Sequence, residues 1–255
     1  MKRLICGTAA YKIFGGDAAA ERLSHAYMLF FADERNLRAA LKLFALKFFG
    51  EDENTRGGRL ILSEGLTDLK VYPAADKKLT ADVAAAIVED AALRPLEYDK
   101  KLYIISGFNE ASPIFQNKLL KILEEPPAGV HFLLGATTLS PVLDTVKSRV
   151  KMLEIPLFTP TQIFAALERE GNNPLNREAS EACGGVLGVA QNMLSGGWYA
   201  ETVNAAREIC SASTVGEAAD AAVKYGDFKY KRDLLAEMQR TYFGELKRYA
   251  FGNYT

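Results

Sequence analysis

Two short, uninterrupted apolar segments with a capped helix between them restrict the fold of this chain more than any other feature. The segments are residues 102–105 and 132–134. Continuous apolar runs of this length are typical of central strands in a parallel sheet, which are buried on both faces. The helix between them is expected to begin after Ser112, with Pro113 in its first turn, and to end before Pro126. This pattern predicts a parallel sheet whose strands are connected by helices.

The same alternation of strand and helix patterns covers the first 155 residues. Apolar periodicity and turn residues predict four further elements, which are strands at 26–31 and 68–72 and helices at 34–49 and 80–94. Polar, glycine-containing residues 51–58 are expected to form a link between two of them. Strands that alternate with helices favour a doubly wound α/β domain, which we place at residues 1–156.

After Pro156 the strand patterns end and helical patterns replace them. Thr159 and Gln162 have the spacing of a capping box at the start of a helix. Further helices are expected between this point and a glycine-rich link that ends at residue 197. The sequence therefore predicts a small helical domain at 157–197 and a short helical segment at 198–255.

The balance of charge excludes a uniformly basic surface for nucleic acid. The chain has 31 Lys and Arg against 32 Asp and Glu, for a net charge of -1. A protein that grips phosphates by itself usually has a basic excess, so any DNA contact is expected to be local or shared with partners. No apolar run approaches the roughly 20 residues that span a bilayer, and no signal segment stands at the start, so we expect a cytoplasmic protein.

Cysteine and histidine are too few and too scattered for a metal site. Cys6, Cys183 and Cys210 lie far apart, so they form neither a disulfide framework nor a C-x-x-C zinc pair. His25 and His131 are the only histidines. We expect no bound metal, and we interpret the cysteines as small core residues.

The chain lacks the residues by which an α/β domain of this type binds a nucleotide. Such domains carry a glycine-rich phosphate loop with a lysine between the first long strand and the next helix. Here the junction contains neither glycine nor lysine, and Asp33 and Glu34 would repel phosphate. No carboxylate stands directly after residues 102–105 to hold Mg²⁺. The sequence therefore predicts that no nucleotide and no other cofactor is bound.

Two strings of residues resemble a known family. Residues 116–127, which read QNKLLKILEEPP, resemble the clamp-loader signature QNALLKxLEEPP, and residues 144–150, DTVKSRV, resemble the Ser-Arg-Cys segment of the same family. The chain is thus similar to the AAA+ clamp-loader family of bacterial DNA polymerase III, and within it to the delta prime subunits. The resemblance implies an AAA+ type parallel sheet with flanking helices, followed by a helical lid and part of a helical collar.

The resemblance also implies a role for Ser148 and Arg149. In the family, this arginine reaches across a subunit boundary to the γ-phosphate of the neighbour's ATP, so Arg149, beside Ser148, is expected to act as a catalytic arginine finger in trans. A guanidinium suits that task because it stays charged and presents a planar fork to phosphate oxygens. Val150 replaces the family's cysteine, which should matter little to a role based on charge.

Two weaker similarities concern positions that sense the nucleotide in active members of the family. Ala136, Thr137 and Thr138 are alternative candidates for the sensor-1 residue. Gly188 stands where active members often carry the sensor-2 arginine. The departure at Gly188 favours a subunit that does not hydrolyse ATP by itself.

The chain differs from the family in two further respects. Residues 51–59 contain none of the four cysteines of the zinc module that many relatives carry there. Residues 199–255 are also fewer than the family's collar requires, so either the chain is truncated or its lineage has a reduced collar.

The function that we expect is that of a non-hydrolysing subunit of the DNA polymerase III holoenzyme, which completes the clamp-loader ring and supplies its arginine finger to a neighbour in DNA replication. Its expected partners are the ATPase subunits and the delta subunit, with the sliding clamp and primer-template DNA contacted through the assembled complex. Two alternatives remain open, an active AAA+ ATPase with a degenerate phosphate loop and a generic α/β interaction module.

Overall fold

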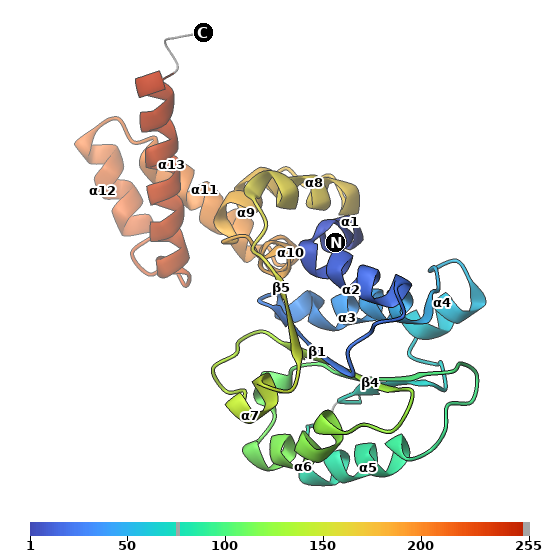
Figure 1. Ribbon diagram of the computed structural model, residues 1–255. Coiled ribbons are helices and arrows are strands. Elements are labelled where there is room, and N and C mark those ends of the chain that lie inside the picture. The colour runs from blue at the N-terminus through green and yellow to red at the C-terminus, as the bar shows by residue number, and fades with distance from the viewer. Residues whose placement is uncertain (75–76, 252–255) are drawn as a thin grey trace. The chain divides into compact units, whose positions relative to one another are not determined.

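The computed structural model describes residues 1–74 and 77–251, except the side chains of 218, 222 and 244–251 (Figure 1). These residues form two compact units. The first unit contains Met1–Gln162 together with Val186–Gly188, and the second contains Ile163–Gly185 and the chain from Val189 onwards. The last four residues of the predicted C-terminal segment lie outside the described residues.

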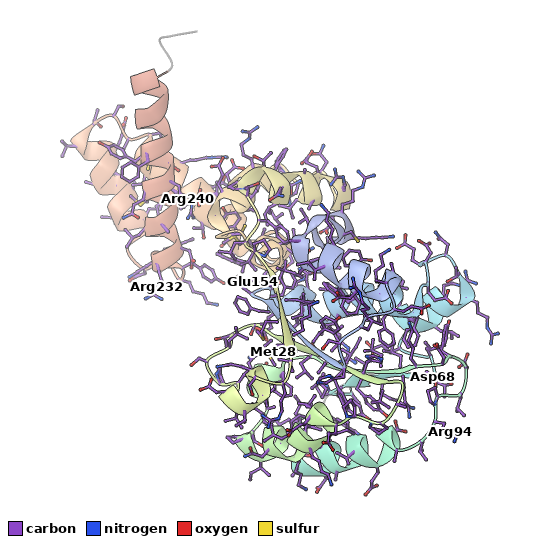
Figure 2. All side chains as sticks on the ribbon, viewed as in Figure 1. Met28, Asp68, Arg94, Glu154, Arg232 and Arg240 are labelled. Atoms are coloured by element: carbon purple, nitrogen blue, oxygen red, sulfur yellow. The ribbon has the colours of Figure 1, made fainter. Side chains whose placement is uncertain are left out.

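The first unit is built on a parallel sheet with the strand order β2-β3-β4-β1-β5. Its strands are β1 (Ala26–Phe31), β2 (Leu69–Tyr72), β3 (Lys101–Ile105), β4 (Val130–Ala136) and β5 (Lys151–Ile155). In the centre of the sheet, Met28 of β1 is paired with Leu134 on one side and Met152 on the other, and its side chain is fully buried (Figure 2). The parallel sheet expected from the apolar runs is therefore present.

Helices cover both faces of this sheet (Figure 1). One side carries α1 (Lys2–Gly7), α2 (Ala9–Ala19), α3 (Glu34–Phe49) and α4 (Arg56–Leu62). The other side carries α5 (Ala81–Ala91) and α6 (Pro113–Glu124), and the short elements η1 (Phe108–Glu110) and α7 (Asp144–Lys147) follow β3 and β4. Each long connection thus returns the chain to the start of the next parallel strand.

Local sequence explains why α3 has the bounds expected for it. The Asp33 side chain caps its first turn by accepting a hydrogen bond from the backbone N–H of Asn36, and Gly50 ends it with a left-handed φ of 71°. Gly135 of β4 lies beneath α3, where an added Cβ would come within 2.6 Å of a methyl group of Leu41. A glycine at this position therefore allows the helix to approach the sheet closely.

The predicted helix at 80–94 ends earlier, since α5 stops at Ala91. The loop that follows is held by Asp68, the residue before β2, which is 1% exposed. Its carboxylate accepts hydrogen bonds from three successive backbone N–H groups, those of Leu96, Glu97 and Tyr98, at 2.8, 2.7 and 2.8 Å. These bonds fix the chain just beyond the end that was predicted for the helix.

The link predicted at 51–58 is also shorter than expected. Thr55 accepts a hydrogen bond from the backbone N–H of Gly58 at 2.9 Å and so caps α4, which begins at Arg56 within the link. The two glycines that suggested a break are accommodated in the first turn of this helix. Tyr98 donates a hydrogen bond to Glu51 at 2.5 Å, which attaches the remainder of the link to the loop that follows α5.

The chain after β5 is helical, as the sequence predicts. Its helices are α8 (Pro160–Glu170), α9 (Asn176–Ala182), α10 (Leu187–Ser195), α11 (Trp198–Cys210), α12 (Val215–Lys224) and α13 (Lys231–Phe251). The capping box expected at Thr159 and Gln162 is formed, with reciprocal hydrogen bonds of 2.9 and 3.3 Å. Within the second unit, Arg240 of α13 pairs with Glu237 (Figure 2).

Candidate functional site

The junction of β1 and α3 contains a buried carboxylate at the starts of two helices. Asp33 is 1% exposed. Its Oδ1 accepts the backbone N–H of Asn36 at 3.1 Å, and its Oδ2 accepts the side-chain amide of Asn36 and the backbone N–H of Gly188, both at 2.8 Å. Asn36 lies in the first turn of α3 and Gly188 in the first turn of α10. Free N–H groups and the helix dipole favour an anion at such positions, and here the chain supplies that anion itself.

Gly188 leaves no space for a side chain beside this carboxylate. A Cβ added to Gly188 would lie 2.1 Å from Oδ1 of Asp33 and 2.9 Å from the Cβ of Arg35. An arginine at residue 188 is therefore incompatible with the observed placement of Asp33. The two positions that the sequence suggested as departures from the family pattern, Asp33 and Gly188, are in direct contact with each other.

The tips of β3 and β4 are joined by a neutral amide. The side-chain oxygen of Asn109 accepts the backbone N–H of Thr137 at 2.9 Å and lies 3.4 Å from its hydroxyl. Among the three candidates for the sensor-1 position, Thr137 is the residue that directly follows β4 and makes this contact. Nucleotide-hydrolysing domains require carboxylate oxygens near this edge to hold Mg²⁺, and Asn109 offers an amide.

Ser148 and Arg149 lie together at the end of α7. The Ser148 hydroxyl donates to the carbonyl of Thr145 at 3.1 Å. The Arg149 guanidinium donates through Nη1 to the same carbonyl at 2.8 Å and to Oγ of Ser148 at 3.3 Å. Its Nε and Nη2 donate to Oε2 of Glu124 at 3.2 and 3.1 Å. The side chain of Arg149 remains 30% exposed, so the structure brings the two expected site residues together at the surface.

Gln116 supports this segment from the interior, a role that the sequence reasoning did not assign. Its side chain is fully buried and donates to the carbonyls of Ala111 and Pro141 at 3.0 and 3.1 Å, while its Oε1 accepts the N–H of Leu143 at 2.9 Å. Leu143 is the residue before α7. The signal in the sequence was a glutamine directly beside Phe115, on the buried face of the predicted helix.

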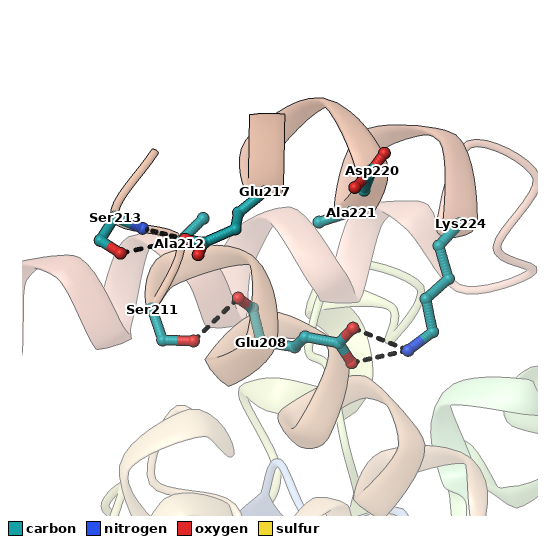
Figure 3. A pocket seen from close by; sticks show the side chains of 8 residues that line it. All are labelled: Glu208, Ser211, Ala212, Ser213, Glu217, Asp220, Ala221 and Lys224. Carbon is teal, nitrogen blue, oxygen red and sulfur yellow. Dashed lines mark hydrogen bonds and ion pairs between the residues drawn. The ribbon is translucent and has the colours of Figure 1, made fainter. Parts of the chain in front are cut away.

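A hollow of about 430 Å³ lies in the second unit between α11 and α12 (Figure 3). Its acidic residues already have partners, because Glu208 pairs with Lys224 at 2.7 Å and Glu217 accepts the N–H of Ser213 at 2.8 Å. In the part of the chain that the structure describes, no group of His, Cys, Asp and Glu is arranged to hold a metal ion. We therefore assign the candidate site to the first unit.

The strand order and the helices on both faces of the parallel sheet define a domain of the AAA+ class. The solved structure of a DNA polymerase III gamma subunit-related protein from Thermotoga maritima MSB8 is similar in fold, with a TM-score of 0.51. The alignment covers 92% of this chain and 78% of that one, at 16% sequence identity. The AAA+ type of fold expected from the resemblance is therefore confirmed.

The family is shown by the sequence itself. A family model described as DNA polymerase III, delta subunit, matches residues 7–159, so the chain belongs to this family of clamp-loader subunits. DNA polymerase III subunit delta' of Bacillus subtilis (strain 168) is 29% identical over 169 residues, which are 64% of this chain and 51% of the relative. DNA polymerase III subunit gamma of Buchnera aphidicola subsp. Schizaphis graminum (strain Sg) is 29% identical over 115 residues, or 42% and 32% of the two chains.

The chain thus spans about half or less of the length of these two relatives. None of the helices in the described ranges is both long and apolar enough to cross a membrane.

Proposed function

We propose that this chain is a non-hydrolysing clamp-loader subunit that completes the loader ring and supplies Arg149 in trans to the ATP site of a neighbouring ATPase subunit. Its partners in this proposal are the ATPase and delta subunits, and it meets the sliding clamp and primer-template DNA through the assembled complex. In the same proposal, residues 157–197 serve as the lid and residues 198–255 as a partial or reduced collar.

The observation that carries the proposal is the Asp33 carboxylate at the start of α3. Three donors bind it, and one of them, the N–H of Gly188, comes from the segment in which active relatives carry a nucleotide-sensing arginine. A bound phosphate would need the same helix terminus and would be repelled by the negative charge. This arrangement favours a domain that does not bind ATP in the usual way.

The environment of Arg149 supports the second half of the proposal. A finger that acts in trans has to be at the surface, on a segment with a defined position, and close to residues that keep its fork ordered. Arg149 is partly exposed, follows a helix whose start is held by buried Gln116, and makes hydrogen bonds through all three guanidinium nitrogens. These features suit an arginine that stabilises charge on a transferring phosphoryl group.

Calorimetric titration of the isolated chain with Mg²⁺·ATP tests the first half. We expect no measurable binding at millimolar nucleotide, because the β1–α3 junction offers neither free backbone donors nor a lysine. A dissociation constant in the micromolar range would instead favour an active ATPase with a degenerate phosphate loop.

ATP hydrolysis by the complex reconstituted with ATPase and delta subunits tests the second half. Arg149→Ala should leave assembly intact and reduce hydrolysis at the facing site by on the order of a thousandfold, which lowers the total rate by the share of that site. Arg149→Lys should restore little, because an ammonium cannot reproduce the forked contact. Arg94→Ala, which removes an exposed arginine after α5 (Figure 2), is the matched control and should hydrolyse ATP at the wild-type rate. An Arg149→Ala complex with wild-type hydrolysis would exclude the arginine-finger role.

A further inference from the structure

The hydrogen bonds of Arg149 show that its guanidinium is held by the chain itself. A guanidinium carries five N–H donors. Four hydrogen bonds engage all three nitrogens, two to Glu124, one to the carbonyl of Thr145 and one to Ser148. At least one N–H of Nη2 therefore stays available for a further acceptor, while the edge formed by Nε and Nη2 is fixed on Glu124.

Glu124 occupies a position that helix stability does not explain. It is the last residue of α6, where the partial negative charge of the helix C-terminus disfavours an acidic side chain and favours a basic one. Its neighbour Leu123 is fully buried, so the backbone that carries Glu124 is anchored in the core. The carboxylate thus starts from a fixed point within hydrogen-bond distance of Arg149.

The pair contributes little to the stability of the fold. The side chains of Arg149 and Glu124 are 30% and 58% exposed, and exposed ion pairs are screened by solvent. The benefit of the contact is geometric instead, because a long arginine side chain otherwise samples many rotamers. Ordering the fork before a ligand arrives lowers the cost of binding that ligand productively.

We propose that Glu124 is a positioning residue, which orients the guanidinium of Arg149 toward the phosphate of a neighbouring subunit. This inference rests on the proposed function. The carboxylate keeps the Nε and Nη2 edge, and the phosphate takes the remaining N–H of Nη2 together with Nη1. The 3.3 Å bond from Nη1 to Ser148 is the longest of the four and is exchanged for the phosphate. The helix α6 therefore contacts both ends of the segment 143–149. Gln116 binds the backbone of Leu143 before α7, and Glu124 binds the side chain of Arg149 after it.

The test uses the complex reconstituted with ATPase and delta subunits. Glu124→Ala should lower kcat at the facing site by about tenfold without changing the KM for ATP, since the finger is present but misoriented. Glu124→Gln keeps an acceptor oxygen and should lose less. Glu125→Gln, at the adjacent exposed position, is the matched control and should behave as the wild type. In the Arg149→Ala background, Glu124→Ala should cause no further loss, because the two residues act as one unit.

A second measurement follows the arginine directly in the isolated chain. The ¹⁵Nε–¹H signal of Arg149, assigned by its loss in Arg149→Lys, should be sharp in the wild type and in Glu125→Gln. It should broaden through exchange with water in Glu124→Ala, because the acceptor is gone.

The outcomes separate this inference from the proposed function. If Arg149→Ala hydrolyses ATP at the wild-type rate, the arginine finger is excluded and the positioning role falls with it. If Arg149→Ala is impaired while Glu124→Ala has the wild-type kcat, the finger stands and the role of Glu124 is overturned. A kcat that rises in Glu124→Ala would also overturn it, because the carboxylate would then compete with the phosphate.

Discussion

Asp33 accepts a hydrogen bond from the backbone N–H of Gly188 at 2.8 Å, although the two residues lie 155 positions apart in the sequence. The contact is close enough that a methyl group at residue 188 would overlap the carboxylate, at 2.1 Å from Oδ1. Because Asp33 is buried and held by three donors, it cannot move aside without losing hydrogen bonds.

We therefore expect Gly188→Ala to lower the free energy of unfolding by about 1–3 kcal/mol, the usual cost of overpacking. Urea denaturation followed by circular dichroism measures it. The control is Gly16→Ala in α2, where an added Cβ meets no atom within 4 Å. That change should raise stability by about 0.5–1 kcal/mol, because alanine is the better helix former. Similar shifts in both variants would show that residue 188 is not crowded.

Removal of the buried carboxylate by Asp33→Ala should lower the free energy of unfolding by about 1–3 kcal/mol, because the N–H groups of Asn36 and Gly188 lose their acceptor. Added inorganic phosphate should recover part of the loss, since an anion can then bind at the helix start. Thermal unfolding with and without phosphate tests both effects. The control is the wild type, in which the Asp33 carboxylate already occupies the position. A phosphate response of equal size in both proteins would contradict a specific anion position at Asp33.

The conformation of the loop after α5 should depend on the carboxylate of Asp68. Asp68→Ala leaves three backbone N–H groups without their acceptor and is expected to lower the free energy of unfolding by about 3 kcal/mol. Hydrogen exchange should show faster exchange at Leu96, Glu97 and Tyr98. Asp99→Ala removes an exposed carboxylate nearby and should change stability by less than about 0.5 kcal/mol. Unchanged protection of the three amides in Asp68→Ala would refute this account of the loop.

Acid should destabilise the first unit through His131. Burial lowers the pKa of His131 from its ordinary value of 6.5; the hydrogen bond to the Ser24 carbonyl acts against this shift, Lys100 and His25 act with it, and Asp99 acts against it. Its Nδ1 donates to the carbonyl of Ser24 at 3.0 Å in the neutral ring. In the unfolded chain the ring takes up a proton first as the pH falls, so this contribution to stability is complete above about pH 6.5 and is lost as the pH falls through the folded-state pKa.

The free energy of unfolding of the wild type should therefore decrease between pH 7.5 and 5.5, with a contribution from this one group of at most about 1.4 kcal/mol per pH unit. Urea titrations at several pH values measure it. His131→Gln should flatten the dependence, and His25→Gln, which removes only one of the smaller influences on His131, should keep most of it. An unchanged slope in His131→Gln would assign the dependence to other groups.

Elements with strong local signals were predicted from the sequence alone. The bounds of β1, α3 and α6 agree with the apolar runs and capping residues that suggested them. The strand β5 was missed, because it has only five residues and its apolar Met152 is exposed, so the apolar residues of the segment neither form a continuous run nor alternate regularly with polar ones. The helix α2 was missed as well, because its paired glycines at 15 and 16 weaken the local helical pattern, and contacts of Phe14 with Tyr27 and Phe44 stabilise it.

The sequence predicted which residues form the candidate site, and it did not predict the hydrogen bonds between them. The absence of a phosphate loop could be seen in the sequence, and Asp33 was expected to repel a phosphate and to suit the start of a helix. Its bond to Gly188 depends on how two distant segments meet, which no local pattern encodes. The contact between Arg149 and Glu124 is of the same kind. It joins the last residue of α6 to an arginine that follows α7 and lies 25 positions further along the chain.

The carboxylate of Asp33 is covalently part of the chain, so it cannot dissociate from the helix terminus as a bound phosphate can. A nucleotide phosphate arrives, is cleaved and leaves, so a helix terminus that holds one passes through several states of charge in each cycle. A side chain that fills the same position does so at any concentration of nucleotide, and no ligand in solution replaces it. The charge that faces the N–H groups of Asn36 and Gly188 is therefore part of the chain and does not change with the binding or release of a ligand.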